Sequence, residues 1–362
     1  MPLEQDIARA FGLGGRIRDV RPHGRGLIND TFLVTTDTGR AILQRLNRRV
    51  FPRPEFVIEN LRTLEEHVRR RAGGDPGTRA LHLPKLFTAR DGKDFAIDAE
   101  GGFWRALGFI ENTCTLATVG DAAQAEEVGF ALGRFHALIH DLDPARLHET
   151  LPGFHNAPGY LARFTDAFAR PRGGADAAEL HQCAAFIEAR RGLVQVLEAA
   201  KQAGRLAIRP IHGDPKLDNF LFDADCRRVV GLIDLDTVHP GLIHYDIGDC
   251  LRSCGNRAGE APVDIAAVRF DLDVGRAVLK RYLAETRGFL TAQDYRYLYD
   301  AIRLIPFELG LRFLTDHLEG DSYFKTDRPG RNLNRALAQF QLTASIERHE
   351  EEIKSLIEAL GV

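Results

Sequence analysis

The chain has 362 residues, of which 44% are hydrophobic and 27% charged, and its formal net charge is −3. This length favours two domains or lobes, and the small negative charge argues against nucleic acid or an anionic membrane as a partner. No apolar run approaches the roughly 20 residues that span a bilayer. The mixed N-terminus is unlike a secretory signal, and five scattered cysteines without Cys-x-x-Cys favour a cytoplasmic protein in which Cys250 and Cys254 are buried, inert thiols.

The first part of the chain is predicted to be rich in β-strand. Apolar residues recur at i, i+4, i+7 and i+11 from Val57, so one helix is expected among the strands. A turn at Asp91-Gly92 is predicted to join two of the strands into a hairpin. The expected strands cover residues 16–22, 31–35, 41–46, 85–88, 95–98 and 103–110, and the hairpin joins 85–88 to 95–98.

Two glycines, Gly24 and Gly26, lie between the first two predicted strands. Glycine in such a turn lets the backbone approach phosphate groups closely, because no side chain intervenes. Taken alone, the pair indicates only an ordinary turn. Together with the polar stretch HGDPKLDN at 212–219, whose side chains are the kind that phosphoryl transfer from ATP requires, it predicts a lid over ATP.

The third predicted strand, residues 41–46, is where a kinase fold places the cation that holds the α- and β-phosphates of ATP. The strand contains no lysine, so Gln44 or Arg45 would have to serve. Side chains alternate along a strand, so only one of the two can face the nucleotide, and charge favours Arg45. The glutamate that would pair with this cation is expected on the following helix, where Glu59 and Glu65 are both candidates.

A junction near residues 110–115 separates this region from a helical one. Glu111 follows an apolar strand there, and backbone groups at this point could pair with adenine, although an ordinary linker is the alternative. Helices are predicted from an N-cap at Asp121, over 176–203 and through 263–362.

These elements predict the fold class α+β, with a small sheet lobe before a large helical lobe. Residues 1–112 would form a small β-rich lobe that binds nucleotide. Residues 113–362 would form a larger, mainly helical lobe with catalytic and substrate-binding groups. A ligand site is expected between the two lobes.

The most informative stretch is HGDPKLDN at 212–219, followed by LIDLD at 232–236. Two short strands around a polar turn are predicted between them. Pairing Phe222 opposite Gly231 would also place Asn219 opposite Asp234, because both pairs of numbers sum to 453. A carboxylate, a cation and two oxygen ligands would then meet at one end of a hairpin, which is the set that phosphoryl transfer from ATP requires.

Each side chain of this motif has an expected role. Asp214 would accept the proton of a substrate hydroxyl or orient that hydroxyl for attack, and Lys216 would stabilise charge on the transferring phosphoryl group. Asn219 and Asp234 supply the hard oxygens that Mg²⁺ prefers, and His212 would fix the loop by hydrogen bonding. The alternative is a polar turn before a strand, since Asp, Pro and Asn are common turn residues.

Further polar residues crowd the same stretch. Asp236 could reach a second metal ion, whereas Asp246 would brace the catalytic loop through backbone N–H groups or cap a helix. Asp249 is expected to be solvated or to cap a helix. His239 and His244 are expected on a polar surface.

The His-Gly-Asp…Asn…Ile-Asp pattern resembles the aminoglycoside phosphotransferase and choline kinase superfamily. Within it, the chain is most similar to N-acetylhexosamine 1-kinases, from about residue 24 to about residue 339. This similarity rests on GLINDTFLV, LQRLN, FWR, FH, IDLDTVHPGLIHYDIGD, ELGLRFLTDHLEGDSYF and NLNRALAQ. The resemblance implies a protein-kinase-like fold, MgATP as donor, and phosphorylation of the anomeric hydroxyl of a free sugar.

The resemblance also assigns residues. It implies that Asp214 is catalytic, that Asn219 and Asp234 bind magnesium, and that Arg312 and Tyr323 contact the sugar. Arginine offers several donors to sugar oxygens or an N-acetyl carbonyl, and tyrosine can stack and hydrogen-bond. The chain departs from protein kinases, because HGD replaces His-Arg-Asp and no Ala-Pro-Glu closes an activation loop.

Two alternatives stay open at this point. The chain could phosphorylate another small alcohol, such as an aminoglycoside, choline or a different hexose. It could also be a nucleotide-binding pseudokinase, but such a protein would be expected to lack Asp214, Asn219 or Asp234, and all three are present. The expected partners are ATP and a small sugar, with no nucleic acid or membrane, in a monomer or simple homodimer.

Overall fold

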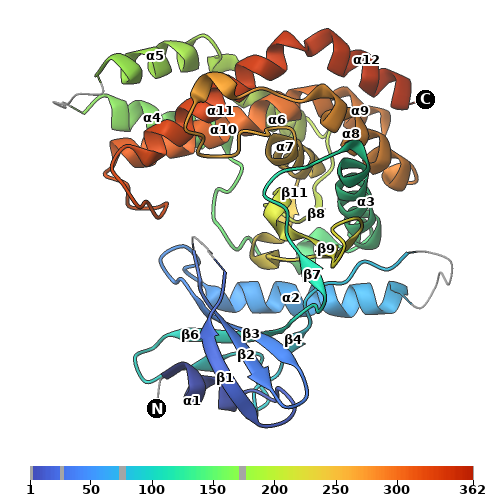
Figure 1. Ribbon diagram of the computed structural model, residues 1–362. Helices are drawn as coiled ribbons and strands as arrows, with labels where there is room; N and C mark the ends of the chain where they lie inside the picture. Colours follow the sequence, from blue (N-terminus) through green and yellow to red (C-terminus); the bar gives the residue numbers. More distant parts are fainter. Residues whose placement is uncertain (1–2, 25–27, 73–78, 171–176, 362) are drawn as a thin grey trace.

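The computed structural model describes residues 3–24, 28–72, 79–170 and 177–361. Figure 1 shows a β-rich N-terminal part below and a larger, mainly helical C-terminal part above. The predicted α+β fold class is confirmed. Within the described residues, no helix has both the length and the apolar character needed to cross a bilayer.

The N-terminal sheet is antiparallel and has the order β1-β2-β3-β6-β4, with β5 also paired to β6. The predicted hairpin between residues 85–88 and 95–98 is wrong, because both short strands pair with β6 and not with each other. The first four residues of β6 are buried, which suits a strand with neighbouring strands on both sides. The strands are β1 (Ile17–Pro22), β2 (Asp30–Thr36), β3 (Arg40–Leu46), β4 (Leu86–Phe87), β5 (Ala96–Ile97) and β6 (Phe103–Gly108).

The C-terminal part contains short strands that carry the polar motifs and helices that enclose them. Asp121 caps α3 as predicted, because its side chain accepts from the Gln124 backbone N–H. The strands are β7 (Thr113–Cys114), β8 (Arg209–Ile211), β9 (Phe220–Asp223), β10 (Val229–Leu232) and β11 (His239–Gly241). The helices are α3 (Ala122–Ile139), α4 (Ala157–Phe168), α5 (Ala177–Glu188), α6 (Val196–Gln202), α7 (Ile243–Cys254), α8 (Leu272–Thr286), α9 (Ala292–Arg296), α10 (Leu298–Leu318), α11 (Arg331–Arg348) and α12 (Glu350–Leu360).

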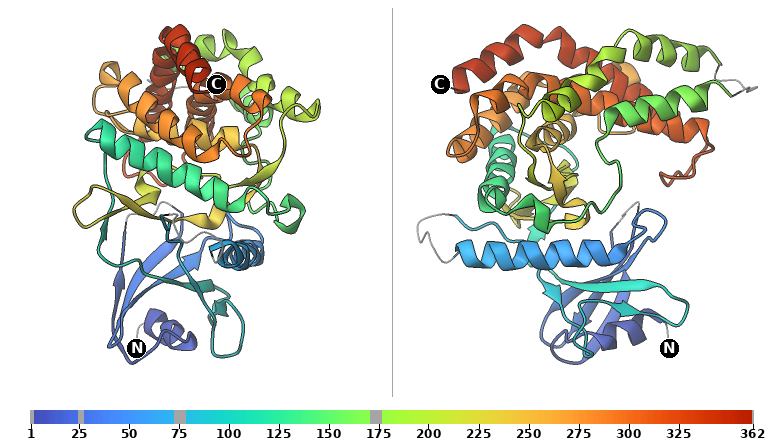
Figure 2. Two further views of the ribbon diagram at one scale, coloured as in Figure 1. Left: turned by 90° about the vertical axis from the view of Figure 1, so that its right-hand side faces the viewer. Right: turned by 180° about the vertical axis from the view of Figure 1, so that it is seen from behind.

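The two helices of the N-terminal part belong to different hydrophobic cores. Helix α1 (Leu3–Ala10), which was not predicted, packs with Leu43 and Trp104 in a small core beneath the sheet. Helix α2 (Pro54–Ala72) lies between the sheet and the C-terminal helices in the views of Figure 2. Its apolar stripe, including Val57 and Leu64, belongs to the main core together with α3 and the motif strands. The main core therefore crosses the predicted lobe boundary.

The β9–β10 hairpin differs in register from the prediction. Leu232 pairs with Phe220, and Gly231 pairs with Leu221 instead of Phe222. An irregularity between Val229 and Gly231 shifts the pairing, as expected of a β-bulge with one extra residue. As a result, Asn219 lies opposite residue 233, whose backbone N–H donates to the Asn219 carbonyl at 2.9 Å.

The cysteines correct a second expectation. Cys114 in β7 and Cys226 in the β9–β10 turn form a disulfide, with their Cα atoms 6.4 Å apart. Disulfides are uncommon in a reducing cytosol, so this pair counts against the cytoplasmic location that the scattered cysteines favoured. Cys183, Cys250 and Cys254 are free and buried, as expected for the last two.

Candidate active site

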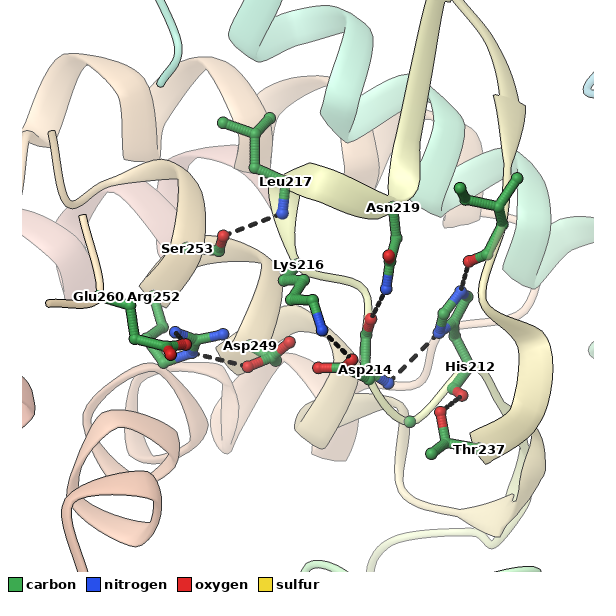
Figure 3. A network of polar contacts seen from close by, with 12 residues as sticks. His212, Asp214, Lys216, Leu217, Asn219, Thr237, Asp249, Arg252, Ser253 and Glu260 are labelled. Carbon is green, nitrogen blue, oxygen red and sulfur yellow. Dashed lines mark hydrogen bonds and ion pairs between the residues drawn. The ribbon is translucent and has the colours of Figure 1, made fainter. Parts of the chain in front are cut away.

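The loop that carries Asp214 begins at the end of β8. Gly213 has φ of 88°, and a Cβ there would lie 2.5 Å from the Thr237 carbonyl oxygen, so only glycine fits. His212 is buried, and its Nε2 lies 3.0 Å from the Ile233 carbonyl oxygen, while its Nδ1 accepts from the Asp214 backbone N–H at 3.3 Å (Figure 3). His212 therefore fixes the loop by hydrogen bonding, as predicted.

Asp246 braces the same loop from α7. Its carboxylate accepts the backbone N–H groups of His212 at 2.7 Å and Gly213 at 2.8 Å, and its Oδ2 lies 2.8 Å from His136 Nε2. Burial would raise the pKa of Asp246, but the His136 hydrogen bond and the other donors hold it below its usual value. The bracing role that the sequence suggested for Asp246 is confirmed.

Asp214 and Lys216 form an ion pair. Lys216 Nζ lies 2.6 Å from Asp214 Oδ2, and both side chains are partly exposed (Figure 3). Burial favours a higher pKa for Asp214, but the charge of Lys216 holds it below its usual value. Asp214 is therefore an ionised acceptor at neutral pH. Desolvation by the surrounding protein would lower the pKa of Lys216, but the charges of Asp214 and Asp234 raise it, so both carboxylates interact electrostatically with this cation.

Asn219 and Asp234 lie at the same end of the β9–β10 hairpin. Asn219 Nδ2 donates to the Asp214 carbonyl oxygen at 2.7 Å, which leaves its Oδ1 without a hydrogen bond from the described residues. Asp234 is an exposed residue with φ of 63°, and its carboxylate likewise accepts no hydrogen bond within the described chain. Surrounding protein and the nearby Asp236 raise its pKa to about 6.

These two free oxygens fit a magnesium ion that takes its other ligands from elsewhere. Among the described residues, no group of three His, Cys, Asp or Glu side chains could hold a metal ion alone. Mg²⁺ commonly uses one or two protein oxygens together with waters and substrate phosphates. The donor set of Asn219 and Asp234 therefore suits a metal ion that arrives with a nucleotide.

Arg45 points away from this cluster, contrary to the prediction. It pairs with Trp104 in the sheet, with its guanidinium 5.9 Å from the Trp104 ring and 3.9 Å from Glu100. The two candidate partners are engaged elsewhere, because Glu59 lies 2.7 Å from His148 and Glu65 lies near Arg62. Strand alternation places Gln44, and not Arg45, on the face of β3 that looks toward the C-terminal part, so the role of Arg45 at the phosphates stays a prediction.

Gln44 contacts a cation that the sequence interpretation missed. Arg105 in β6 is 1% exposed and donates to Gln44 Oε1 through Nε at 3.0 Å and Nη2 at 2.6 Å. Arg105 also forms an ion pair with Asp236, which accepts in addition from Asn29 Nδ2 at 2.7 Å. Asp236 is thus occupied by side chains of the N-terminal part and is not the free metal ligand that was considered. The FWR segment at 103–105 was the available signal, but its importance depends on a contact with residue 236.

The remaining nucleotide-site candidates lie apart from these contacts. Gly24 follows β1 with φ of 74°, and a Cβ there would meet nothing within 4 Å. Gly26 lies outside the described residues. The Glu111 side chain forms a bidentate ion pair with Arg40, with Arg40 Nε 3.0 Å from Glu111 Oε1. The lid and adenine-binding roles stay predictions.

Arg312 in α10 lies within a cage of aromatic rings. No acidic side chain of the described residues forms an ion pair with it. Burial would lower the pKa of Arg312, but nearby Tyr160, Tyr323, Glu308 and Asp214 raise it above its usual value. Arg312 is therefore a cation within the electrostatic reach of Asp214. Its guanidinium carbon lies 5.1 Å from the ring centre of Phe154, 5.4 Å from Tyr160, 5.9 Å from Tyr323 and 5.4 Å from Phe324.

Three neighbouring polar residues are more buried than predicted. Asp249 is buried and accepts from Arg252 Nε at 2.7 Å (Figure 3), so it is neither solvated nor a cap. His239 and His244 are also buried and not on a polar surface. His239 lies in β11 and His244 in the first turn of α7, and the surrounding core encloses both. Dense polar sequence here indicates a hydrogen-bonded interior.

We expect His244 to make folding stability depend on pH. Burial lowers its folded pKa to about 4, whereas an unfolded histidine titrates near 6.5. Below pH 6.5 the unfolded chain binds the extra proton, so stability falls as the pH decreases toward 4. His244→Asn should remove about 2 kcal/mol of the stability difference between pH 7.5 and pH 5. Urea unfolding at both pH values measures the stability difference in the wild-type protein and in His244→Asn. The same difference in both proteins would contradict the role of His244 in this pH dependence.

Comparisons with known proteins agree with this geometry. The family model for the phosphotransferase enzyme family (APH) matches residues 19–289. An aminoglycoside phosphotransferase from Alicyclobacillus acidocaldarius subsp. acidocaldarius DSM 446 has a similar structure, with a TM-score of 0.61, 18% identity, and coverage of 98% of this chain and 96% of that chain. A choline kinase from Cryptosporidium parvum Iowa II has a TM-score of 0.56 and 13% identity over 95% of this chain and 92% of its own.

A spectinomycin phosphotransferase solved with ADP and spectinomycin is also similar, with a TM-score of 0.53 and 14% identity over 94% of this chain and 99% of its own. Identities this low show a shared fold and no more. The family match covers most of the chain and includes the loop of Asp214, Asn219 and Asp234. The chain belongs to the phosphotransferase enzyme family.

Proposed function

We propose that this protein is an ATP-dependent kinase that phosphorylates the anomeric C1 hydroxyl of a free N-acetylhexosamine. In this proposal residues 1–112 bind the nucleotide, and residues 113–362 supply the catalytic and acceptor-binding groups. A cytoplasmic location, where ATP is supplied, is part of the proposal, and the Cys114–Cys226 disulfide is the observation that counts against this part. The observation that carries it is Arg312, a caged cation in the electrostatic neighbourhood of Asp214.

Arg312 favours a neutral acceptor over a cationic one. A guanidinium without an acidic partner among the described residues repels choline and the ammonium groups of aminoglycosides. The same group offers up to five N–H donors to neutral oxygens, such as sugar hydroxyls and an N-acetyl carbonyl. The rings of Tyr160 and Tyr323 add flat surfaces and hydroxyl groups for a sugar. This combination supports an acetamido sugar.

The side chains can then carry out an in-line transfer. Asp214 accepts the proton of the C1 hydroxyl, or orients it, while that oxygen attacks the γ-phosphorus of ATP and the bond to the β-phosphate oxygen breaks. Lys216 interacts electrostatically with both Asp214 and Asp234, and its positive charge can stabilise the negative charge on the phosphoryl group during transfer. Asn219 and Asp234 would hold Mg²⁺, which would neutralise charge on the phosphates. ADP and the sugar 1-phosphate leave.

The test is ADP release from MgATP with a panel of acceptors: N-acetylglucosamine, N-acetylgalactosamine, other hexoses, choline and an aminoglycoside. Turnover of an N-acetylhexosamine, with phosphate at C1 by NMR, supports the proposal. Turnover of only choline or an aminoglycoside would replace the acceptor and keep the chemistry. Nucleotide binding without turnover of any acceptor would favour the pseudokinase alternative.

Arg312→Gln should weaken acceptor binding selectively. Loss of charge-assisted hydrogen bonds costs about 1.5–3 kcal/mol, so we expect KM for N-acetylglucosamine to rise roughly 10- to 100-fold, with KM for ATP little changed. Arg190→Gln is the control, because Arg190 also lies over an aromatic ring, 3.6 Å from the centre of Phe186, but its guanidinium pairs with Glu347 and has no contact with Asp214 among the described residues. Equal KM values for the Arg312→Gln and wild-type enzymes would contradict the acceptor role.

A further inference from the structure

One carboxylate holds the loop that follows α10. Asp316, in the last turn of this helix, is 3% exposed. Its Oδ1 accepts the backbone N–H groups of Ser322 at 3.0 Å and Tyr323 at 2.8 Å. Its Oδ2 accepts the backbone N–H of Phe324 at 3.0 Å and Nδ2 of Asn332 at 2.9 Å. Three successive backbone donors of one loop thus meet one side chain.

The loop needs such a partner because its backbone leaves regular structure abruptly. Gly320 and Asp321 both have positive φ, of 92° and 56°, so the chain turns out of the helix there. The next three N–H groups then find no helical carbonyl, and backbone donors near the interior must be satisfied by some acceptor. An aspartate side chain supplies that acceptor over a short distance in sequence.

The same loop provides half of the aromatic cage around Arg312. Tyr323 and Phe324 face the Arg312 guanidinium, and their rings contact each other with centres 4.8 Å apart. Phe324 also packs on Phe313 at 4.6 Å. Arg312 precedes Asp316 by four residues in α10, so both side chains lie on one face of the helix. The acceptor-binding arginine and the loop anchor are therefore set by one rigid element.

We propose that Asp316 is a positioning residue that sets acceptor affinity by holding Tyr323 and Phe324 against Arg312. The inference rests on the proposed function, because it takes the Arg312 cage as the acceptor site. Asp316 itself has all four hydrogen bonds directed at the protein, so it acts through the loop and does not touch the acceptor. Its carboxylate, and not only its shape, is required. In an asparagine one acceptor oxygen becomes an NH₂ group, which would face two donors.

The kinetic test compares Asp316→Asn with Asp294→Asn. Asp294 is a matched control: it is 1% exposed, accepts the Thr291 backbone N–H at 2.8 Å in the cap of α9, and pairs with Arg209 at 3.0 Å. Both variants should lose stability. Only Asp316→Asn should raise KM for N-acetylglucosamine, by roughly tenfold or more, with KM for ATP unchanged.

A similar rise in KM for both variants, or none for Asp316→Asn, would overturn the proposal. If Asp316→Asn does not fold, Asn332→Ser is the second variant, because it removes one donor to Asp316 and one to Asp321. It should shift KM for the acceptor in the same direction by a smaller factor, and an unchanged value would count against the proposal.

Hydrogen–deuterium exchange tests the loop without any acceptor. In the wild-type protein the peptide that covers residues 321–325 should be protected, and in Asp316→Asn it should exchange faster while α10 stays protected. Unchanged exchange would overturn the proposal. If the wild-type enzyme phosphorylates a different acceptor of the panel, the proposed function fails, and the KM comparison is made with that acceptor. The exchange result then decides whether Asp316 holds the loop.

Discussion

Replacing Asp214 by asparagine is expected to lower kcat by about a thousandfold, the range typical of losing a positioned general base. The variant keeps the shape of the side chain and the carbonyl oxygen that accepts from Asn219 Nδ2. The brace from Asp246 to the preceding two residues is also independent of the carboxylate. The loop should therefore keep its position and lose its proton acceptor. Single-turnover phosphate transfer and ADP affinity, measured together, separate chemistry from binding.

Asp218→Asn is the matched control for this prediction. Asp218 lies four residues further along the same loop and is exposed. It should keep near wild-type kcat, because its carboxylate makes no hydrogen bond within the described residues. A comparable loss of kcat in both variants would mean that the loop tolerates no change of charge, and it would contradict the role of Asp214 as the proton acceptor. A full loss of ADP affinity in Asp214→Asn would point to a nucleotide-binding role instead.

Replacing Arg105 by methionine should lower the free energy of unfolding by about 3–5 kcal/mol, as found when one partner of a buried ion pair is removed. The reason is the carboxylate that stays behind. Asp236 is 3% exposed, and without Arg105 its remaining hydrogen-bond partner among the described residues is Asn29, at 2.7 Å. Gln44 Oε1 loses its donor at the same time. Urea denaturation followed by circular dichroism measures the loss.

A double variant and a surface control make this measurement specific. Arg105→Met combined with Asp236→Asn removes the buried charge and should be more stable than Arg105→Met alone. Arg62→Met removes a partly exposed arginine that pairs with Asp94 and Glu65, so it should cost only about 1 kcal/mol or less. A double variant less stable than the single one would show that Asp236 does not depend on Arg105 for its charge balance.

Local patterns in the sequence were enough for the fold class and the motif loop. The α3 cap at Asp121 and the brace at Asp246 both follow from residue type and nearby spacing. The β9–β10 register could not be derived, because the shift near Gly231 depends on a bulge whose extra residue, Val230, accepts a hydrogen bond from the distant His82. Symmetric pairing is the simplest assumption from sequence, and a bulge breaks it without a clear local signal.

Contacts between distant segments explain the other differences from the sequence-based predictions. Gln44 and Arg45 were distinguished by charge, whereas the choice depends on which face of β3 meets Arg105 and Asp236. Asp249 and His244 look like surface residues when polar letters are read alone, but tertiary packing encloses them. The aromatic cage of Arg312 draws on three separate segments, so only the family resemblance suggested its importance before the structure.

The position of α2 limits how this protein can be divided. A polypeptide ending near residue 112 would keep the strands and the small core around Trp104, yet it would leave Val57, Leu61 and Leu64 facing water. An uncovered apolar stripe of this kind promotes self-association. Isolating the N-terminal region for ligand titrations would therefore yield aggregates, and a usable fragment must either retain the C-terminal helices or carry polar replacements along that stripe.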